Sequence, residues 1–237
     1  MKYEIKGDNL PVLYFNLENG EQILTESGAM SWMTPNVEMS TTSNGGIGKM
    51  FGRMFSGESL FRNIYTSNGD GMIALSSSFP GSIRTFDLSG GNGMIFQKGT
   101  YLASSVNVET SISFRKKIGA GFFGGEGFIL QQAHGDGMLF LEIDGSATEY
   151  DLQPGQQIIV SSGHLAAMSA TCSYEIKTVK GIKNKIFGGE GFFNTVITGP
   201  GKVILQSMPI MKIANALSPY INVPSSNSSP TIKFGED

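Results

Sequence analysis

Short apolar runs separated by glycine turns recur along the chain, and they predict β-strands. Three of them follow a G-x-G turn: MIALS (72–76), MLFLEI (138–143) and KVILQS (202–207). Apolar runs of this length between glycine turns are typical of strands rather than helices. The segment 209–220 differs, because Pro209 is followed by apolar residues at helical spacing. These residues are Ile210, Ile213, Ala214 and Leu217. They predict a short amphipathic helix near the end of an all-β protein.

The strand pattern occurs three times. The segments YFNLENGEQILTESGAM (14–30), TFDLSGGNGMIFQKGTY (85–101) and EYDLQPGQQIIVSSGHL (149–165) align without gaps. Each has Asn or Asp followed by Leu, then a glycine three residues later and a second glycine eight residues further on. A glycine-rich phrase follows in each unit: FSGESLF (55–61), FGGEGF (123–128) and FGGEGFF (187–193). Several landmarks that keep one order indicate an internal repeat.

The repeat divides the chain into three β units and a terminal segment. We expect β repeat 1 at 1–79, β repeat 2 at 80–146, β repeat 3 at 147–208, and the helix with a polar tail at 209–237. A unit of about 65–70 residues with roughly six short strands is a small β-sandwich or jelly roll, marginally stable alone. Three such units docked side by side share strand edges and bury apolar faces against one another.

One glutamate keeps the same place in each glycine-rich phrase: Glu58, Glu126 and Glu190. The functional interpretation is a set of three equivalent carboxylates that bind a cation or a polar ligand. The structural interpretation is that each carboxylate accepts hydrogen bonds from backbone N–H groups in its glycine turn. The flanking glycines leave several amides close by, which favours the structural interpretation.

Basic residues gather just before these glutamates. They are Lys49, Arg53, Arg115, Lys116, Lys117, Lys177, Lys180, Lys183 and Lys185. The windows 47–57, 113–125 and 177–189 contain no Asp or Glu. One interpretation is a solvated link whose apolar side covers a sheet edge. The other is a basic patch in each unit that faces an anionic surface, either phospholipid headgroups or RNA.

Composition limits the chemistry that the chain can carry. The net charge is −3, which argues against tight RNA binding because that needs a strongly basic face. The single cysteine, Cys172, forms no internal disulfide, and this usage is typical of a reducing compartment such as the cytoplasm. Neither a signal peptide nor an apolar run long enough to span a bilayer is visible in the sequence.

No catalytic arrangement stands out. His134 and His164 are the two histidines, and no Cys/His spacing matches a zinc site. GAGFFG (119–124) matches a dinucleotide motif, but it leads into a strand instead of a helix. The sequence therefore predicts a protein that is not an enzyme and that needs no cofactor or metal.

The repeated motifs resemble a known family. SGESLF (56–61), GGEGF (124–128), GGEGFF (188–193) and the SGAM and SGHL segments are similar to prokaryotic relatives of the altered-inheritance-of-mitochondria family, a domain of unknown function. The resemblance covers about residues 1–220. It implies a fold like the tryptophan RNA-binding attenuation protein, a short double-stranded β-helix or jelly-roll sandwich present three times in each chain. It also implies a homotrimer that closes into a ring of nine such units. No catalytic residues come with the family.

Three functions follow as hypotheses. The first is a non-enzymatic ring-forming scaffold or binding protein, cytoplasmic and peripheral to membranes or to protein complexes. The second is a ring that binds RNA or a small ligand, as the attenuation protein does. The third is an enzyme that uses Glu58, Glu126 and Glu190, which requires those carboxylates to converge in one pocket.

Overall fold

A computed structural model describes residues 1–42, 62–116, 127–178, 193–217 and 220. This part of the chain is almost entirely β-structure, as the sequence predicts. Sheet A has the strand order β1 (Lys2–Lys6), β2 (Val12–Leu17), β7 (Gly71–Ser76) and β4 (Met30–Met33). Sheet B has the order β5 (Val37–Thr42), β6 (Arg62–Ser67), β3 (Gln22–Glu26), β10 (Tyr101–Ser105), β13 (Met138–Asp144) and β8 (Gly81–Asp87).

The second half of the chain completes sheet C and forms sheet D. Sheet C has the order β11 (Val108–Lys116), β12 (Phe128–Gly135), β9 (Met94–Gln97), β16 (Leu165–Ser169), β19 (Gly201–Gln206) and β14 (Ala147–Leu152). Sheet D has the order β15 (Gln157–Ser161), β18 (Phe193–Thr198) and β17 (Ser173–Thr178). Short 3-10 turns lie at Ser89–Gly91, Lys98–Thr100 and Ser162–His164, and the helix α3 spans Ile210–Leu217.

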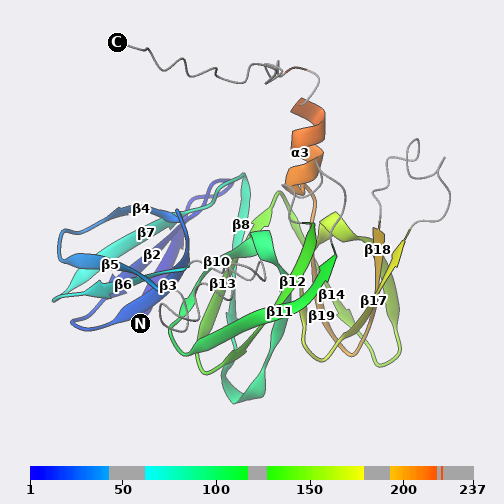
Figure 1. Ribbon diagram of the computed structural model, residues 1–237, viewed down its shortest axis with the longest axis horizontal. Helices are drawn as coiled ribbons and strands as arrows, with labels where there is room; N and C mark the ends of the chain where they lie inside the picture. The colour runs from blue at the N-terminus through cyan, green and yellow to red at the C-terminus, as the bar shows by residue number, and fades with distance from the viewer. Residues whose placement is uncertain (43–61, 117–126, 179–192, 218–219, 221–237) are drawn as a thin grey trace, which may run out of the picture.

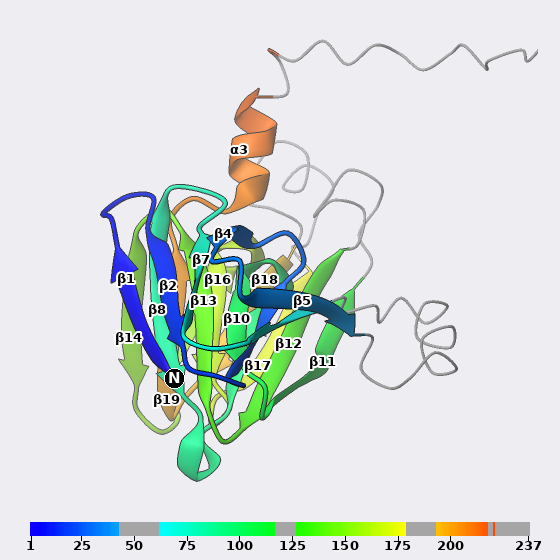
Figure 2. The same ribbon diagram turned by 90° about the vertical axis from the view of Figure 1, so that its left-hand side faces the viewer.

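The four sheets stack as successive layers with a hydrophobic core between each pair. Phe15 of sheet A packs with Tyr65 and Phe140 of sheet B in the first core. The second core joins sheets B and C, and the third joins sheets C and D. Figures 1 and 2 show the N-terminal strands at one end of the long axis and β17 and β18 at the other.

Sheets B and C are buried on both faces because another sheet packs against each face. Successive side chains of their strands point to opposite sides and so enter two different cores. In β9, Phe96 belongs to the core between sheets B and C, whereas Ile95 belongs to the core between sheets C and D. Both are buried. Sheets A and D are the end layers, and each has one face that no other described sheet covers.

In each of sheets B and C, a strand pairs with another that follows much later in the chain, and the register of this pairing is the same in both sheets. In sheet B, β3 pairs with β10 through Ala103↔Thr25, Ser104↔Leu24 and Ser105↔Ile23. In sheet C, β9 pairs with β16 through Ala167↔Phe96, Met168↔Ile95 and Ser169↔Met94. We call these two pairings the first and second junctions. The pairs correspond position by position when the ungapped alignment of the sequence segments is continued four residues past its end, to Ser105 and Ser169.

A glycine with positive φ follows the first long strand of each segment. Gly20, Gly91 and Gly155 have φ values of 80°, 86° and 79°. An L-residue with a side chain rarely adopts this conformation, whereas glycine does so at little cost. The recurrence of glycine at this turn therefore has a backbone cause.

The predicted terminal helix is present as α3 and projects beyond the ends of the strands (Figure 1). Within the described residues, no helix is long and apolar enough to cross a membrane.

Candidate functional site

Most of the predicted site residues lie outside the described part of the chain. These are the three repeated glutamates, Glu58, Glu126 and Glu190, and the basic residues Lys49, Arg53, Lys117, Lys180, Lys183 and Lys185. Both interpretations of the glutamates therefore stay predictions.

The remaining basic residues lie on two edge strands that touch each other. Arg115 is half-buried on β11, and the Lys116 backbone pairs with Phe128. Lys177 lies on β17, where its Nζ is 3.2 Å from Glu175 Oε2. The two strands meet through a 2.9 Å hydrogen bond between the hydroxyls of Ser113 and Tyr174. The structure thus brings Arg115 and Lys177 onto neighbouring strands of adjacent layers.

The two histidines and the cysteine each have a different environment, and they form no nucleophilic pair in the described structure. His134 Nε2 lies 3.4 Å from Glu109 Oε2 on an exposed part of the surface. His164 Nδ1 is 2.7 Å from the backbone oxygen of Gln206. Cys172 is buried, and burial raises the pKa of its thiol. Among the described residues, no group of three His, Cys, Asp or Glu side chains is placed to hold a metal ion.

The two ends of the stack carry open strand edges. Among the described strands, β4 pairs only with β7 and β15 pairs only with β18. The equivalents of β4 are β10 and β16, and the equivalents of β15 are β3 and β9. Within the chain these strands pair with each other, β3 with β10 at the first junction and β9 with β16 at the second. An unpaired edge presents a row of backbone N–H and C=O groups to another strand.

Trp32 on the open edge of β4 occupies a position that is buried elsewhere. The alignment matches it to Ala103 and Ala167, which are both fully buried, whereas Trp32 is 45% exposed. The cross-strand partner of Trp32 is Ala74. The equivalent pairs are Ala103↔Phe140 and Ala167↔Ile204. A large and a small side chain have therefore changed places across the strand pair, which keeps the combined volume of this face similar to that of a packed core.

Ile159 on the open edge of β15 is the matching feature at the other end. Its equivalents, Leu24 and Ile95, are 5% and 7% exposed, whereas Ile159 is 67% exposed. Tyr14 extends the apolar patch around Trp32, with ring centroids 5.9 Å apart. The faces that a neighbouring layer would cover thus keep large apolar side chains, as a contact surface does.

Polar pairs span the two junctions at equivalent positions. At the second junction, Gln206 Nε2 donates to Gln97 Oε1 at 3.3 Å, and the Asp144 N–H donates to Gln206 Oε1 at 3.3 Å. At the first junction, the corresponding residues are the carboxylic acids Glu26 and Glu142. The Ser78 N–H donates to Glu142 Oε2 at 2.8 Å. Burial raises the pKa of Glu142 to about 7, and the charges of Asp144 and Glu26 add to this effect.

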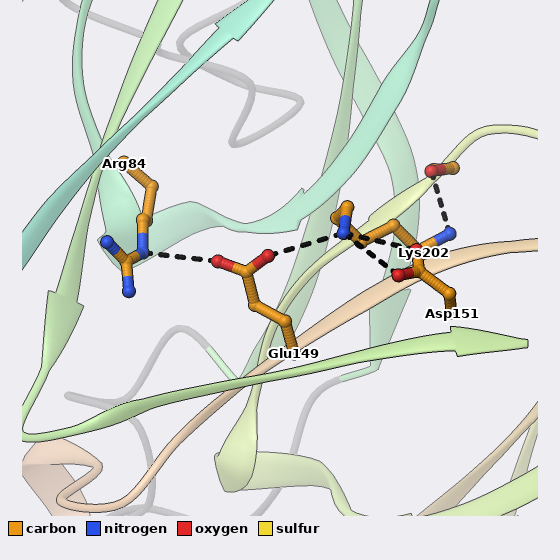
Figure 3. Close-up of polar contacts among 5 residues, drawn as sticks. Arg84, Glu149, Asp151 and Lys202 are labelled. Atoms are coloured by element: carbon orange, nitrogen blue, oxygen red, sulfur yellow. Dashed lines mark hydrogen bonds and ion pairs between the residues drawn. The ribbon is translucent and has the colours of Figure 1, made fainter.

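A chain of ion pairs links sheets B and C at the surface (Figure 3). Arg84 Nε on β8 is 3.3 Å from Glu149 Oε1 on β14. Lys202 Nζ on β19 is 3.3 Å from Glu149 Oε2 and 3.1 Å from Asp151 Oδ1. These side chains are about half exposed, so water screens their attraction and the chain fixes the layers only weakly.

Sequence reasoning missed Trp32 and Ile159 as candidate site residues. The signal was present in the alignment, because a tryptophan stands where the other two units have alanine. Its meaning depends on knowing that the alanines are buried at strand junctions, and only the sheet order shows this.

The described structure defines a layered all-β protein with the open strand edges of β4 and β15 at the two ends of its stack. A sequence model of the family described as mitochondrial biogenesis AIM24 matches residues 3–208, and the chain belongs to this family. It is 32% identical over 219 residues to the uncharacterised protein M6_Spy0233 of Streptococcus pyogenes serotype M6, covering 89% of this chain and 87% of that protein. The crystal structure of protein SPYM3_0169 from Streptococcus pyogenes matches with a TM-score of 0.79 at 28% identity, covering 93% of this chain and 99% of that chain.

Proposed function

We propose that this protein is a non-enzymatic scaffold that assembles head to tail into a closed homotrimeric ring. In this proposal each chain supplies three tandem jelly-roll units like those of the attenuation protein, so that the ring holds nine. The open edge of β15 in one copy pairs with the open edge of β4 in the next copy. The role of the ring is to present repeated surfaces to a membrane or to other proteins.

The equivalence between the open edges and the internal junctions carries this proposal. Transferring the register of the first and second junctions to the ends predicts the pairs Trp32↔Val160, Met33↔Ile159 and Thr34↔Ile158 between copies. In one chain, Val160 already packs in the core between sheets C and D, and Met33 packs against the core between sheets A and B. The pairing therefore places Trp32 beside the core between sheets C and D of one copy and Ile159 beside the core between sheets A and B of the next, so that both cores continue across the contact.

Closure follows from the position of the two edges. They lie at opposite ends of the stack, so the contact is head to tail and uses two different surfaces. Such contacts form either an open filament or a closed ring. A ring leaves no β4 or β15 edge open, which removes the tendency of unpaired edges to aggregate.

Light scattering and the fluorescence of Trp32 test the assembly together. Trp32 is the single tryptophan of the chain, so its emission reports on this contact alone. We expect a mass three times that of the 25.4 kDa chain and blue-shifted tryptophan emission. The Ile159→Lys variant places a charge in the contact and should yield monomers with red-shifted emission. Tyr150→Lys, which changes an exposed aromatic residue on β14, is the matched control and should leave both readouts unchanged.

Two results would overturn the proposal. A wild-type monomer at micromolar concentration would remove the ring. A trimer that Ile159→Lys leaves intact would place the contact elsewhere. The alternatives of RNA or small-ligand binding and of glutamate-based catalysis stay predictions, because the residues they depend on lie largely outside the described structure.

A further inference from the structure

Strand β1 covers an edge of sheet A that is open at the equivalent place in sheet B. In the repeat, β2 corresponds to β8. β2 pairs with β7 and β8 pairs with β13 in the same register, through Phe15↔Ile73 and Phe86↔Leu139. β1 pairs with the other side of β2, whereas β8 ends its sheet among the described strands. The backbone N–H and C=O groups that β2 offers to β1 are therefore left open on β8.

The added strand completes the burial of an aromatic ring in sheet A. Phe15 and Phe86 occupy equivalent positions, and each packs in a core between two sheets. Phe15 is fully buried, with Tyr3 of β1 opposite it and the two ring centroids 6.5 Å apart. Phe86 is only half-buried. The exposed side of Phe86 thus marks the place where an added strand would bring an apolar side chain.

The tail of the chain contains a segment with the pattern of β1. Residues 232–237 read IKFGED, and the first three match Met, Lys and Tyr at positions 1–3 in type. Apolar and polar residues alternate in both segments, as in a strand with one buried face. When residues 232–237 are placed on β8 in the register that β1 has on β2, Phe234 lies opposite Phe86.

The same register brings opposite charges together. Lys233 falls opposite Asp87, which is exposed. Glu236 falls opposite Arg84, whose side chain is 41% exposed although it also contacts the carboxylate shown in Figure 3. Opposite charges directly across a strand pair are favourable, whereas like charges are not. On β14, which also ends its sheet among the described strands, Glu236 would face Thr148. The segment therefore fits β8 better than β14.

The chain between α3 and this segment is long enough for the pairing. β8 begins at the end of the stack from which α3 projects, because Gly81 pairs with Asp144 and the Asp144 carbonyl accepts the Met208 N–H at 3.2 Å. α3 has eight residues and is about 12 Å long, and β8 has seven and is about 23 Å long. The 13 steps from Tyr220 to Lys233 (233 − 220) span up to about 43 Å when extended. This reach exceeds the combined length of the helix and the strand.

We propose that residues 232–237 pair with the open edge of β8 in the same chain, as a further antiparallel strand of sheet B. In this position Phe234 completes the burial of Phe86, as Tyr3 does for Phe15. The segment also closes an edge that a strand of another molecule could otherwise use. The docking does not depend on the proposed ring, because the ring contact uses the edges of β4 and β15.

Hydrogen exchange of the full chain, read by mass spectrometry, tests the docking. In the wild type we expect the backbone amides of 232–236 to exchange at least about tenfold more slowly than in an unstructured peptide of the same sequence. Phe234→Asp should return them to the unstructured rate and speed exchange in β8, because it places a charge against the core. Ser228→Asp adds the same charge outside the paired segment and should exchange as the wild type does. Light scattering should give one mass for all three proteins.

A disulfide identifies the edge that the segment uses. In the proposed register Gly235 lies opposite Thr85, and Cα atoms of directly paired residues are close enough for a disulfide. Thr85→Cys combined with Gly235→Cys should therefore form a disulfide within one chain. The equivalent of Thr85 on β14 is Glu149, so Glu149→Cys combined with Gly235→Cys is the matched control and should stay reduced. The native Cys172 is buried and does not compete.

Several results would overturn the docking. One is exchange of 232–236 at the unstructured rate in the wild type, and another is an equal loss of protection in Phe234→Asp and Ser228→Asp. A disulfide that forms in the control pair places the segment on β14, and one that joins two chains places it on a neighbouring copy. Either result overturns the proposal. If the wild type is monomeric by light scattering yet 232–236 are protected in a Phe234-dependent way, the ring fails and the docking stands.

Discussion

The first and second junctions share one backbone arrangement but differ in the side chains that cross it. Both have the same strand register. In the neighbouring strand pairs, β10–β13 and β16–β19, a bulge lies at the same place, between Tyr101 and Ala103 in one and between Leu165 and Ala167 in the other. Phe140 and Ile204 occupy equivalent buried positions, and so do Glu142 and Gln206. The comparison shows that the register tolerates large changes in side-chain volume and charge. It also predicts that the two junctions differ in the stability lost when a buried side chain is removed and in how their stability depends on pH.

Removing the ring of Phe140 should have the largest effect. This ring is fully buried and makes edge-to-face contacts with Phe15 and Tyr3, with centroids 5.0 Å apart in both cases. Phe140→Ala should lower the free energy of unfolding by about 3–5 kcal/mol, because the site loses both transfer energy and packing. Urea denaturation followed by circular dichroism measures the loss. Phe140→Leu should cost less, and a loss below about 1 kcal/mol in Phe140→Ala would show that the first junction is loosely packed.

Exchanging the carboxylic acid Glu142 and the amide Gln206 between the junctions should move the pH dependence of the free energy of unfolding from one junction to the other. The folded protein holds a proton on Glu142 more tightly than the unfolded chain does, because its pKa is raised from 4.5 to about 7. This group therefore lowers stability as pH rises from about 4.5 to about 7, and the full loss is present above that range. Glu142→Gln should raise the free energy of unfolding at pH 8 by an amount on the order of 1–3 kcal/mol and change it little at pH 4.5.

The reciprocal variant provides the control for that experiment. Gln206→Glu introduces a carboxyl group at the buried equivalent position, so it should destabilise the protein at pH 8 more than at pH 5. Denaturant titrations at several pH values measure both variants. Some pH dependence should survive in Glu142→Gln, because burial also raises the pKa of Asp144 to about 6. If Glu142→Gln unfolds with the wild-type pH profile, Glu142 is solvated and the contrast between the junctions is lost.

Breaking the surface ion pairs should have the smallest effect. Arg84→Ala removes the contact with Glu149 that links sheet B to sheet C, and Glu149 keeps Lys202 as a partner. The free energy of unfolding should fall by less than about 1 kcal/mol at low salt, and the difference should shrink as salt rises. Thermal unfolding at two salt concentrations measures this. A loss that is large and independent of salt would mean that the arginine side chain acts through packing.

Much of the local structure was predictable from the sequence. The apolar runs MIALS and MLFLEI lie within β7 and β13, and β19 covers all of KVILQS except its last residue, Ser207. The spacing of apolar residues after Pro209 located α3. Both signals are local, because alternation and helical periodicity reflect the immediate neighbours of a residue. The site was far less predictable. The prominent glutamates lie outside the described residues. No motif in the sequence marks Trp32 or Ile159 as an interface residue, although Ile159 lies within the repeated segment 149–165.

The sequence by itself determined where strands and turns form, because glycine conformations and apolar alternation act over a few residues. It also determined that three segments share one pattern. Only the tertiary structure decided that β3 pairs with β10 and β9 with β16, which leaves β4 and β15 as the open ends. That choice depends on contacts between distant segments, and it makes a buried alanine in two segments equivalent to an exposed tryptophan in the third. The same packing placed Glu142 where its charge is costly, a property that depends on burial between layers and not on the neighbours of Glu142 in the chain.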